Sequence, residues 1–144
     1  MNFKIRDAKV TDAEAIWKLN TEEMGYTFSL EATRGKLIKL LTDVNNRIFV
    51  AVADGMIVGY IHANGYELLF APSMRNVLAI AVSSQYKRQG IGRALLTEVE
   101  QWAVESGSTG VRLVSGEMRT EAHEFYRSCG YESKKKQLNF KKMI

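Results

Sequence analysis

A basic turn at residues 87–93 has the residue types that bind phosphate groups in proteins. It reads Lys-Arg-Gln-Gly-Ile-Gly-Arg. Its two glycines let the backbone bend and keep side chains away from a ligand. A helix that starts beside them directs its first unpaired amide groups at an anion on its axis. Since the lysine and two arginines add positive charge, this turn is predicted to hold a phosphate or pyrophosphate.

The segments on either side of the turn are suited to position it. The apolar run 77–82, Val-Leu-Ala-Ile-Ala-Val, is short and β-branched, which predicts a buried strand. After the turn, Ile91, Leu95, Val99 and Trp102 recur at helical spacing. The sequence therefore predicts a strand, an anion-binding turn and a helix in succession.

The other elements follow from alternation, caps and turns. A capping box at Thr11 and Glu14 and a cap at Ser29 predict the first two helices, and Asp54-Gly55 predicts a hairpin. Further strands are expected at 3–7, 47–53, 56–66, 110–115 and 131–143, the last as one strand or two short ones, and a fourth helix at 121–128. The predicted order is βααβββαβαβ, a mixed α+β class with a mostly antiparallel sheet of six to seven strands and four helices.

Length and composition predict one soluble globular domain over residues 1–144. Hydrophobic residues make up 46% and charged residues 25% of the chain. No apolar run approaches the roughly 20 residues of a membrane helix, and the first residues lack the apolar core of a signal peptide. The single cysteine, Cys129, excludes an internal disulfide. The simplest location is therefore a reducing cytoplasm, without a membrane partner.

The net charge of +4 is concentrated near the C-terminus, where five lysines and no acidic residue follow residue 133. Such a segment could contact nucleic acid or cofactor phosphates. The preferred interpretation is the outer face of an edge strand, where lysines prevent unwanted pairing. Because no aromatic platform for base stacking accompanies these lysines, no nucleic-acid partner is predicted.

Two motifs carry a resemblance to a known family. Residues 87–92 resemble the acetyl-CoA signature of the GNAT superfamily of N-acetyltransferases, which is Gln or Arg, two residues of any type, Gly, any residue, then Gly or Ala. The departure is Lys87 at the first position. Residues 122–131, Ala-His-Glu-Phe-Tyr-Arg-Ser-Cys-Gly-Tyr, resemble a later motif of the same family. Since the order of elements also matches, the chain resembles a small single-domain bacterial member over nearly its whole length.

The resemblance implies a GNAT fold in which one parallel strand pair splays at the cofactor site. It also implies transfer of an acetyl group from the thioester of acetyl-CoA directly to an amine. The pantetheine arm would run along the strand before the turn, and the Val82 amide would be a candidate oxyanion donor. The residues implied in cofactor binding are Ile80, Ala81, Val82, Lys87, Arg88, Gln89, Gly90, Ile91, Gly92 and Arg93.

The resemblance makes Tyr126 the candidate general acid. A phenol with a reference pKa near 10 is protonated at neutral pH and can donate to the leaving thiolate. The alternative is a packing residue whose hydroxyl reaches water. Glu67, after the third strand, is the candidate general base, directly or through a water. Glu117, Glu23 and a water acting alone remain alternatives.

The histidines and the cysteine are assigned structural roles. His62 shares one strand face with Asn64, so a substrate-facing role is an alternative that is not favoured. His123 is expected to pack or cap. Cys129 ends a helix, where the dipole disfavours a thiolate nucleophile. No histidine and carboxylate cluster has metal-ligand spacing, so no metal is predicted.

Two classes of function remain open for this sequence. The first is an N-acetyltransferase acting on a primary amine of a small molecule or peptide. The second is a non-catalytic acyl-CoA-binding sensor or scaffold, which would need neither Tyr126 nor a base. A homodimer is compatible with the resemblance. The end of the chain is also similar to small bacterial members that acetylate aminoalkylphosphonates, and such an acceptor would need basic residues that Arg75 or Arg119 could supply.

Overall fold

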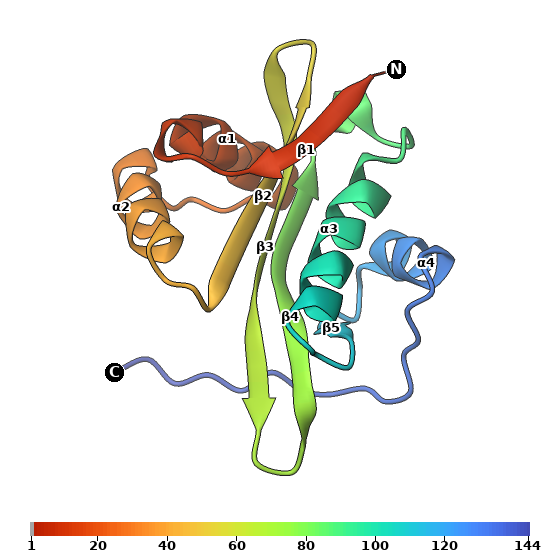
Figure 1. Cartoon of the computed structure of the whole chain (residues 1–144). Coiled ribbons are helices and arrows are strands. Elements are labelled where there is room, and N and C mark those ends of the chain that lie inside the picture. The colour runs from red at the N-terminus through yellow and green to blue at the C-terminus, as the bar shows by residue number, and fades with distance from the viewer. Residues whose placement is uncertain (1) are drawn as a thin grey trace. The chain divides into compact units, whose positions relative to one another are not determined.

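The computed structural model describes residues 2–144 and is shown in Figure 1. These residues divide into two compact units, the first ending at Leu113 and the second spanning Val114–Ile144. Within residues 2–144, no helix combines the length and the apolar character that crossing a membrane requires.

A five-stranded mixed sheet forms the centre of the first unit (Figure 1). The first four strands pair antiparallel in sequence order, and the last joins the edge in parallel. This confirms the mixed class and the parallel pair, but gives five strands where six to seven are predicted. The strands are β1 (Phe3–Asp7), β2 (Asn46–Ala53), β3 (Met56–Leu68), β4 (Ala71–Val82) and β5 (Val111–Leu113).

Helices cover both faces of this sheet. On one face, α1 (Ala13–Met24) and α2 (Leu30–Leu41) pack on Tyr60 and Ala81 in a buried apolar cluster. On the other face lies α3 (Ile91–Glu105), and a Cβ at Gly59 would meet its Ile91 and Leu95 side chains at 3.3 and 3.4 Å. Alternate residues of β3 therefore face opposite layers.

The predicted N-terminal cap is confirmed at α2 and is wrong at α1. Ser29 caps α2 as predicted, since its hydroxyl accepts from the Ala32 amide at 3.0 Å. At α1 the prediction of Thr11 as cap is wrong: a 3-10 turn occupies Val10–Asp12, and the α-helix starts at Ala13. Asp12 accepts the Lys9 amide at 2.8 Å and binds the Arg6 guanidinium through both carboxylate oxygens, which fixes this turn.

The second unit contains α4 (Thr120–Ser128) and an irregular segment from Tyr131 to the last residue. The prediction of one or two strands at 131–143 is therefore wrong, and with it the interpretation of the lysines as an edge strand. The apolar side chains of this segment do not form a buried face: Leu138, Phe140 and Met143 are 80%, 86% and 79% exposed. A strand without a buried face has little to fix its register.

Candidate active site

The predicted anion-binding turn is formed at the end of β4. After Val82, a 3-10 turn over Ser84–Tyr86 leads to Gly90, which has φ +85° and directly precedes α3. The first backbone hydrogen bond of α3 runs from the Ala94 amide to the Gly90 carbonyl at 3.0 Å. The amides before Ala94 thus precede the helix's own hydrogen-bond ladder. No atom lies within 4 Å of a Cβ built at Gly90, so the space beside it is open.

Two acidic side chains from other elements hold this turn. Glu23, near the end of α1, accepts the Ser84 amide at 3.0 Å and lies 3.9 Å from the Lys87 ammonium. Asp54, in the β2–β3 hairpin, accepts the Tyr86 hydroxyl at 3.2 Å. Glu23, one of the alternative bases, is therefore engaged with the turn.

The strand leading into the turn has an edge that β5 leaves unpaired. β5 pairs with β4 only from Arg75 to Val77, while β4 stays paired with β3 up to Val82. The Ser83 amide donates to the Val58 carbonyl at 2.8 Å. Along a strand, the backbone N–H and C=O groups of successive residues point alternately to the two neighbouring sides. Because the Ser83 amide points toward β3, the backbone groups of Ala81 also point toward β3, and those of Ile80 and Val82 point away from it. Ile80 and Val82 thus have the backbone orientation expected of pantetheine partners, whereas Ala81 pairs with β3 and is buried.

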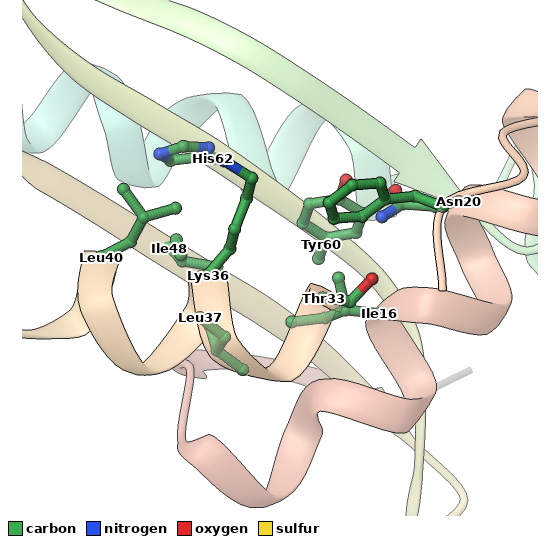
Figure 2. Close-up of a pocket in the computed structure, with 10 residues that line it drawn as sticks. Ile16, Asn20, Thr33, Lys36, Leu37, Leu40, Ile48, Tyr60 and His62 are labelled. Atoms are coloured by element: carbon green, nitrogen blue, oxygen red, sulfur yellow. The ribbon is translucent and has the colours of Figure 1, made fainter. Parts of the chain in front are cut away.

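A pocket of about 140 Å³ lies on the face covered by α1 and α2 (Figure 2). The Tyr60 hydroxyl donates to Asn20 Oδ1 at 2.5 Å, and His62 Nε2 lies 2.7 Å from Asn46 Oδ1. Burial raises the pKa of Tyr60 to about 12 and lowers the pKa of His62. Both groups are therefore uncharged at neutral pH. The lining residues are Ile16, Asn20, Phe28, Thr33, Lys36, Leu37, Leu40, Ile48, Tyr60 and His62.

The structure does not bring Glu67 to the anion-binding turn. Glu67 lies at the far end of β3, where its carboxylate accepts a hydrogen bond from the Ser73 hydroxyl across the β3–β4 hairpin. Ser73 is about 30 Å from Val82 along β4, at roughly 3.3 Å per residue.

Tyr126 is the buried residue of α4, with 9% of its surface exposed. Its ring centroid lies 5.3 Å from that of Phe125 and 6.3 Å from that of Tyr131. The pKa of Tyr126 is raised, first by burial; the nearby Arg119 lowers it and Cys129 raises it. The phenol therefore holds its proton at neutral pH, as a general acid must.

The other candidates in the second unit have structural contacts. Glu117 forms an ion pair with Lys136 at 3.2 Å. His123 Nε2 lies 2.9 Å from the Gly116 carbonyl oxygen, in keeping with a packing or capping role. Across residues 2–144, no three His, Cys, Asp or Glu side chains are grouped closely enough to hold a metal ion.

The sequence analysis missed the pocket and most of its polar lining. Asn20, Lys36 and Tyr60 come from three different elements and share no motif. The available signal was Tyr60, His62 and Asn64 at alternate positions of an otherwise apolar strand. Since alternation places them on one face, these three predict a polar strip on the sheet.

Comparison with known proteins identifies the family. Residues 13–131 match the Acetyltransferase (GNAT) family. This chain belongs to the GNAT family of acetyltransferases. The matched range includes both sequence motifs, the turn before α3 and all of α4.

Two of the relatives are a mammalian and a bacterial protein named as N-acetyltransferases. The chain is 33% identical over 106 residues to N-acetyltransferase family 8 member 2 of Rattus norvegicus, covering 72% of this chain and 46% of the relative. It is 28% identical over 145 residues to aminoglycoside N(6')-acetyltransferase type 1 of Stenotrophomonas maltophilia, covering 95% and 91%. This chain thus spans about half the length of the rat relative and most of the bacterial one.

The fold also has solved counterparts. An aminoglycoside N-acetyltransferase in complex with CoA superposes with a TM-score of 0.89 over 99% of this chain and 96% of its own. At 17% identity, this likeness establishes the shared fold and leaves the acceptor undetermined.

Proposed function

We propose that this chain transfers the acetyl group of acetyl-CoA to a primary amine of a small molecule or peptide. The observation that carries the proposal is the turn before α3, at the end of the strand whose edge β5 leaves unpaired. The turn supplies amides and basic side chains for a diphosphate. The open edge of β4 supplies backbone partners for an extended pantetheine arm. A reducing cytoplasm remains part of this proposal.

The chemistry assigned to the chain is a direct transfer. The neutral amine attacks the thioester carbonyl, the C–N bond forms, and the C–S bond breaks to release a thiolate. The Val82 amide, whose strand alternation turns it away from β3, is the proposed donor to the oxyanion. Tyr126 is the proposed acid that protonates the thiolate, since burial keeps its phenol protonated.

Water is the proposed acceptor of the proton that the amine loses. Glu23 is engaged with the Ser84 amide, Glu67 lies at the β3–β4 hairpin, and Glu117 is paired with Lys136. Glu23 and Glu117 thus have other partners, and Glu67 is far along the sheet from the end of β4. A water molecule beside the amine can accept its proton without a neighbouring carboxylate.

The test is CoA thiol release with acetyl-CoA and a panel of amines, alongside calorimetry with acetyl-CoA. Thiol release that depends on the amine supports the transferase. Binding of acetyl-CoA without transfer to any amine supports the non-catalytic acyl-CoA-binding function instead. Absence of both binding and transfer contradicts the proposal as a whole.

A further inference from the structure

The pocket on the α1 and α2 face of the sheet begins beside the position proposed for the reaction. Tyr60 pairs with Ala81 across β3 and β4, and Val82, the proposed oxyanion donor, is the next residue. With strands about 4.8 Å apart and residues about 3.3 Å apart along them, the Tyr60 backbone lies about 6 Å from that of Val82. His62 pairs with Ala79, so it marks the end of the pocket that is further from Val82.

Short side chains on β4 separate the pocket from the unpaired edge of that strand. Ala79 and Ala81 pair with His62 and Tyr60, and both alanines pack in the apolar cluster that contains Tyr60. At these two positions β4 presents only methyl groups on this face. A molecule in the pocket can therefore extend over β4 toward the edge that the proposed function assigns to pantetheine.

The end of the pocket near Val82 offers a hydrogen-bond acceptor of fixed orientation. The Tyr60 hydroxyl donates its proton to Asn20 Oδ1 at 2.5 Å, and Figure 2 shows the two side chains together at this end. The phenol oxygen keeps a lone pair that can accept an N–H group. An amine that donates to this oxygen retains its own lone pair for attack on a carbonyl.

The walls beyond Tyr60 are mainly apolar. Ile16, Leu37 and Ile48 are buried side chains of three different elements that line the pocket. The pocket volume of about 140 Å³ is close to that of a cavity of about 150 Å³ that holds benzene. The pocket thus has room for a group of about six carbon atoms.

The charge in the pocket is positive. Of the lining residues that the structure describes, Lys36 is charged and none is acidic. Figure 2 shows the Lys36 side chain reaching from α2 toward His62, at the end away from Val82. Within residues 2–113, no carboxylate oxygen lies within 4.0 Å of the Lys36 ammonium. A second cationic group on a bound molecule would therefore meet a like charge at this end.

We propose that the acceptor is a primary amine on an apolar chain or ring without a second cationic group, and that the pocket binds this chain while Tyr60 accepts an N–H of the amine. The inference rests on the proposed transferase function and specifies its substrate class. Apolar surroundings and the Lys36 charge both disfavour an ammonium group. Since the pocket favours the neutral amine, which is the attacking form, no carboxylate is needed beside it.

Matched acceptors test the proposal through CoA thiol release. Hexylamine and 1,5-diaminopentane have the same number of non-hydrogen atoms and differ by a terminal methyl group against a second ammonium. We expect kcat/KM per amine to be about tenfold or more higher for hexylamine than for 1,5-diaminopentane or an aminoglycoside. Hexylamine should also exceed propylamine by about tenfold or more, because its chain buries three more methylene groups. An equal or higher value for 1,5-diaminopentane, the aminoglycoside or propylamine overturns the inference.

Two variants test the assigned residues. Tyr60→Phe should lower kcat/KM for hexylamine about tenfold, because the amine loses its hydrogen-bond acceptor. Its Kd for acetyl-CoA should match the parent's, which also reports intact folding. Lys36→Glu, at an exposed position of α2, should shift the ratio of the hexylamine and 1,5-diaminopentane values about tenfold toward the diamine.

Lys39→Glu is the matched control for the charge change. Lys39 is exposed on the next turn of α2 and is not part of the pocket lining, so the ratio should stay at the parent's value. An unchanged ratio in Lys36→Glu, or unchanged kcat/KM in Tyr60→Phe, contradicts the assignment of the pocket to the acceptor.

The outcomes separate the two claims. Transfer to amines without a preference for apolar monoamines overturns only the acceptor assignment. Binding of acetyl-CoA without transfer to any acceptor overturns the transferase proposal, and the acceptor assignment with it.

Discussion

At the scale of single residues, burial sets the protonation state of the proposed general acid and of two side chains that line the pocket. It raises the pKa of Tyr126 and Tyr60 and lowers the pKa of His62. All three are neutral at pH 7, because burial disfavours the charged form of each. Tyr126 can then donate a proton, as its proposed role as general acid requires.

Tyr126→Phe should lower kcat about a hundredfold or more, the usual effect of removing a general acid. The calorimetric Kd for acetyl-CoA should not change, because the proposed contacts with the diphosphate are in the first unit. Tyr26→Phe is the matched control, since Tyr26 is 58% exposed. Equal turnover by Tyr126→Phe and the parent would show that the tyrosine only packs.

Ionisation of Tyr60 should lower the stability of the folded protein in alkaline solution. In the unfolded chain its phenol ionises near pH 10, whereas in the folded chain it stays protonated until about pH 12. The folded state thus binds more protons in this window, and the free energy of unfolding decreases as pH rises from 10 to 12. Two pKa units correspond to about 2 to 3 kcal/mol.

Urea unfolding between pH 8 and 12 measures this effect as the difference between the parent and Tyr60→Phe. The variant loses the bond to Asn20 at every pH, so the slope is compared and not the absolute stability. Parallel pH profiles for the two proteins would contradict a raised pKa.

At the scale of elements, the strand, turn and helix around residues 77–107 were predictable because each depends on local features. β-Branched residues, glycines and helical spacing lie within a few residues of one another. That α1 is capped at Asp12 and not at Thr11 was not predictable in this way. Asp12 is held by an ion pair with Arg6, which lies in the preceding strand. The attachment of α1 to the turn through Glu23 joins residues 61 positions apart and left no local signal.

Substitution of Glu23 should separate its hydrogen bond from its charge. Glu23→Gln keeps an oxygen acceptor for the Ser84 amide and removes a negative charge near Lys87, so acetyl-CoA should bind as tightly as in the parent or more tightly. Glu23→Ala leaves that amide without its acceptor and should raise the Kd about fivefold to tenfold. Glu22→Ala, at the exposed neighbouring position, is the control. Weaker binding by Glu23→Gln than by Glu23→Ala would contradict the positioning role.

At the scale of the whole molecule, the mixed class and the order of elements up to α4 were predictable, but the strand expected after α4, the number of strands and the pocket were not. The C-terminal segment 131–143 reads as strand-like in the sequence, yet strand formation depends on a partner and a buried face that local sequence does not report. The pocket requires two helices to pack over β2 and β3, which brings together Asn20, Lys36, Ile48 and Tyr60. Nothing in the local pattern around any one of these residues indicates the other three.

The most direct test of the account is calorimetric titration of acetyl-CoA into the parent, Gly90→Glu and Gly107→Glu. Both glycines have a left-handed backbone, with φ +85° and +77°, and open space at Cβ. Gly90 precedes α3, whereas Gly107 follows it, so both substitutions strain the backbone but only Gly90→Glu adds a carboxylate beside the proposed diphosphate site. We predict that the parent and Gly107→Glu bind with similar Kd and that Gly90→Glu binds at least about tenfold more weakly. Equal binding by Gly90→Glu, or no binding by the parent, would contradict the assignment of the turn before α3 as the cofactor site.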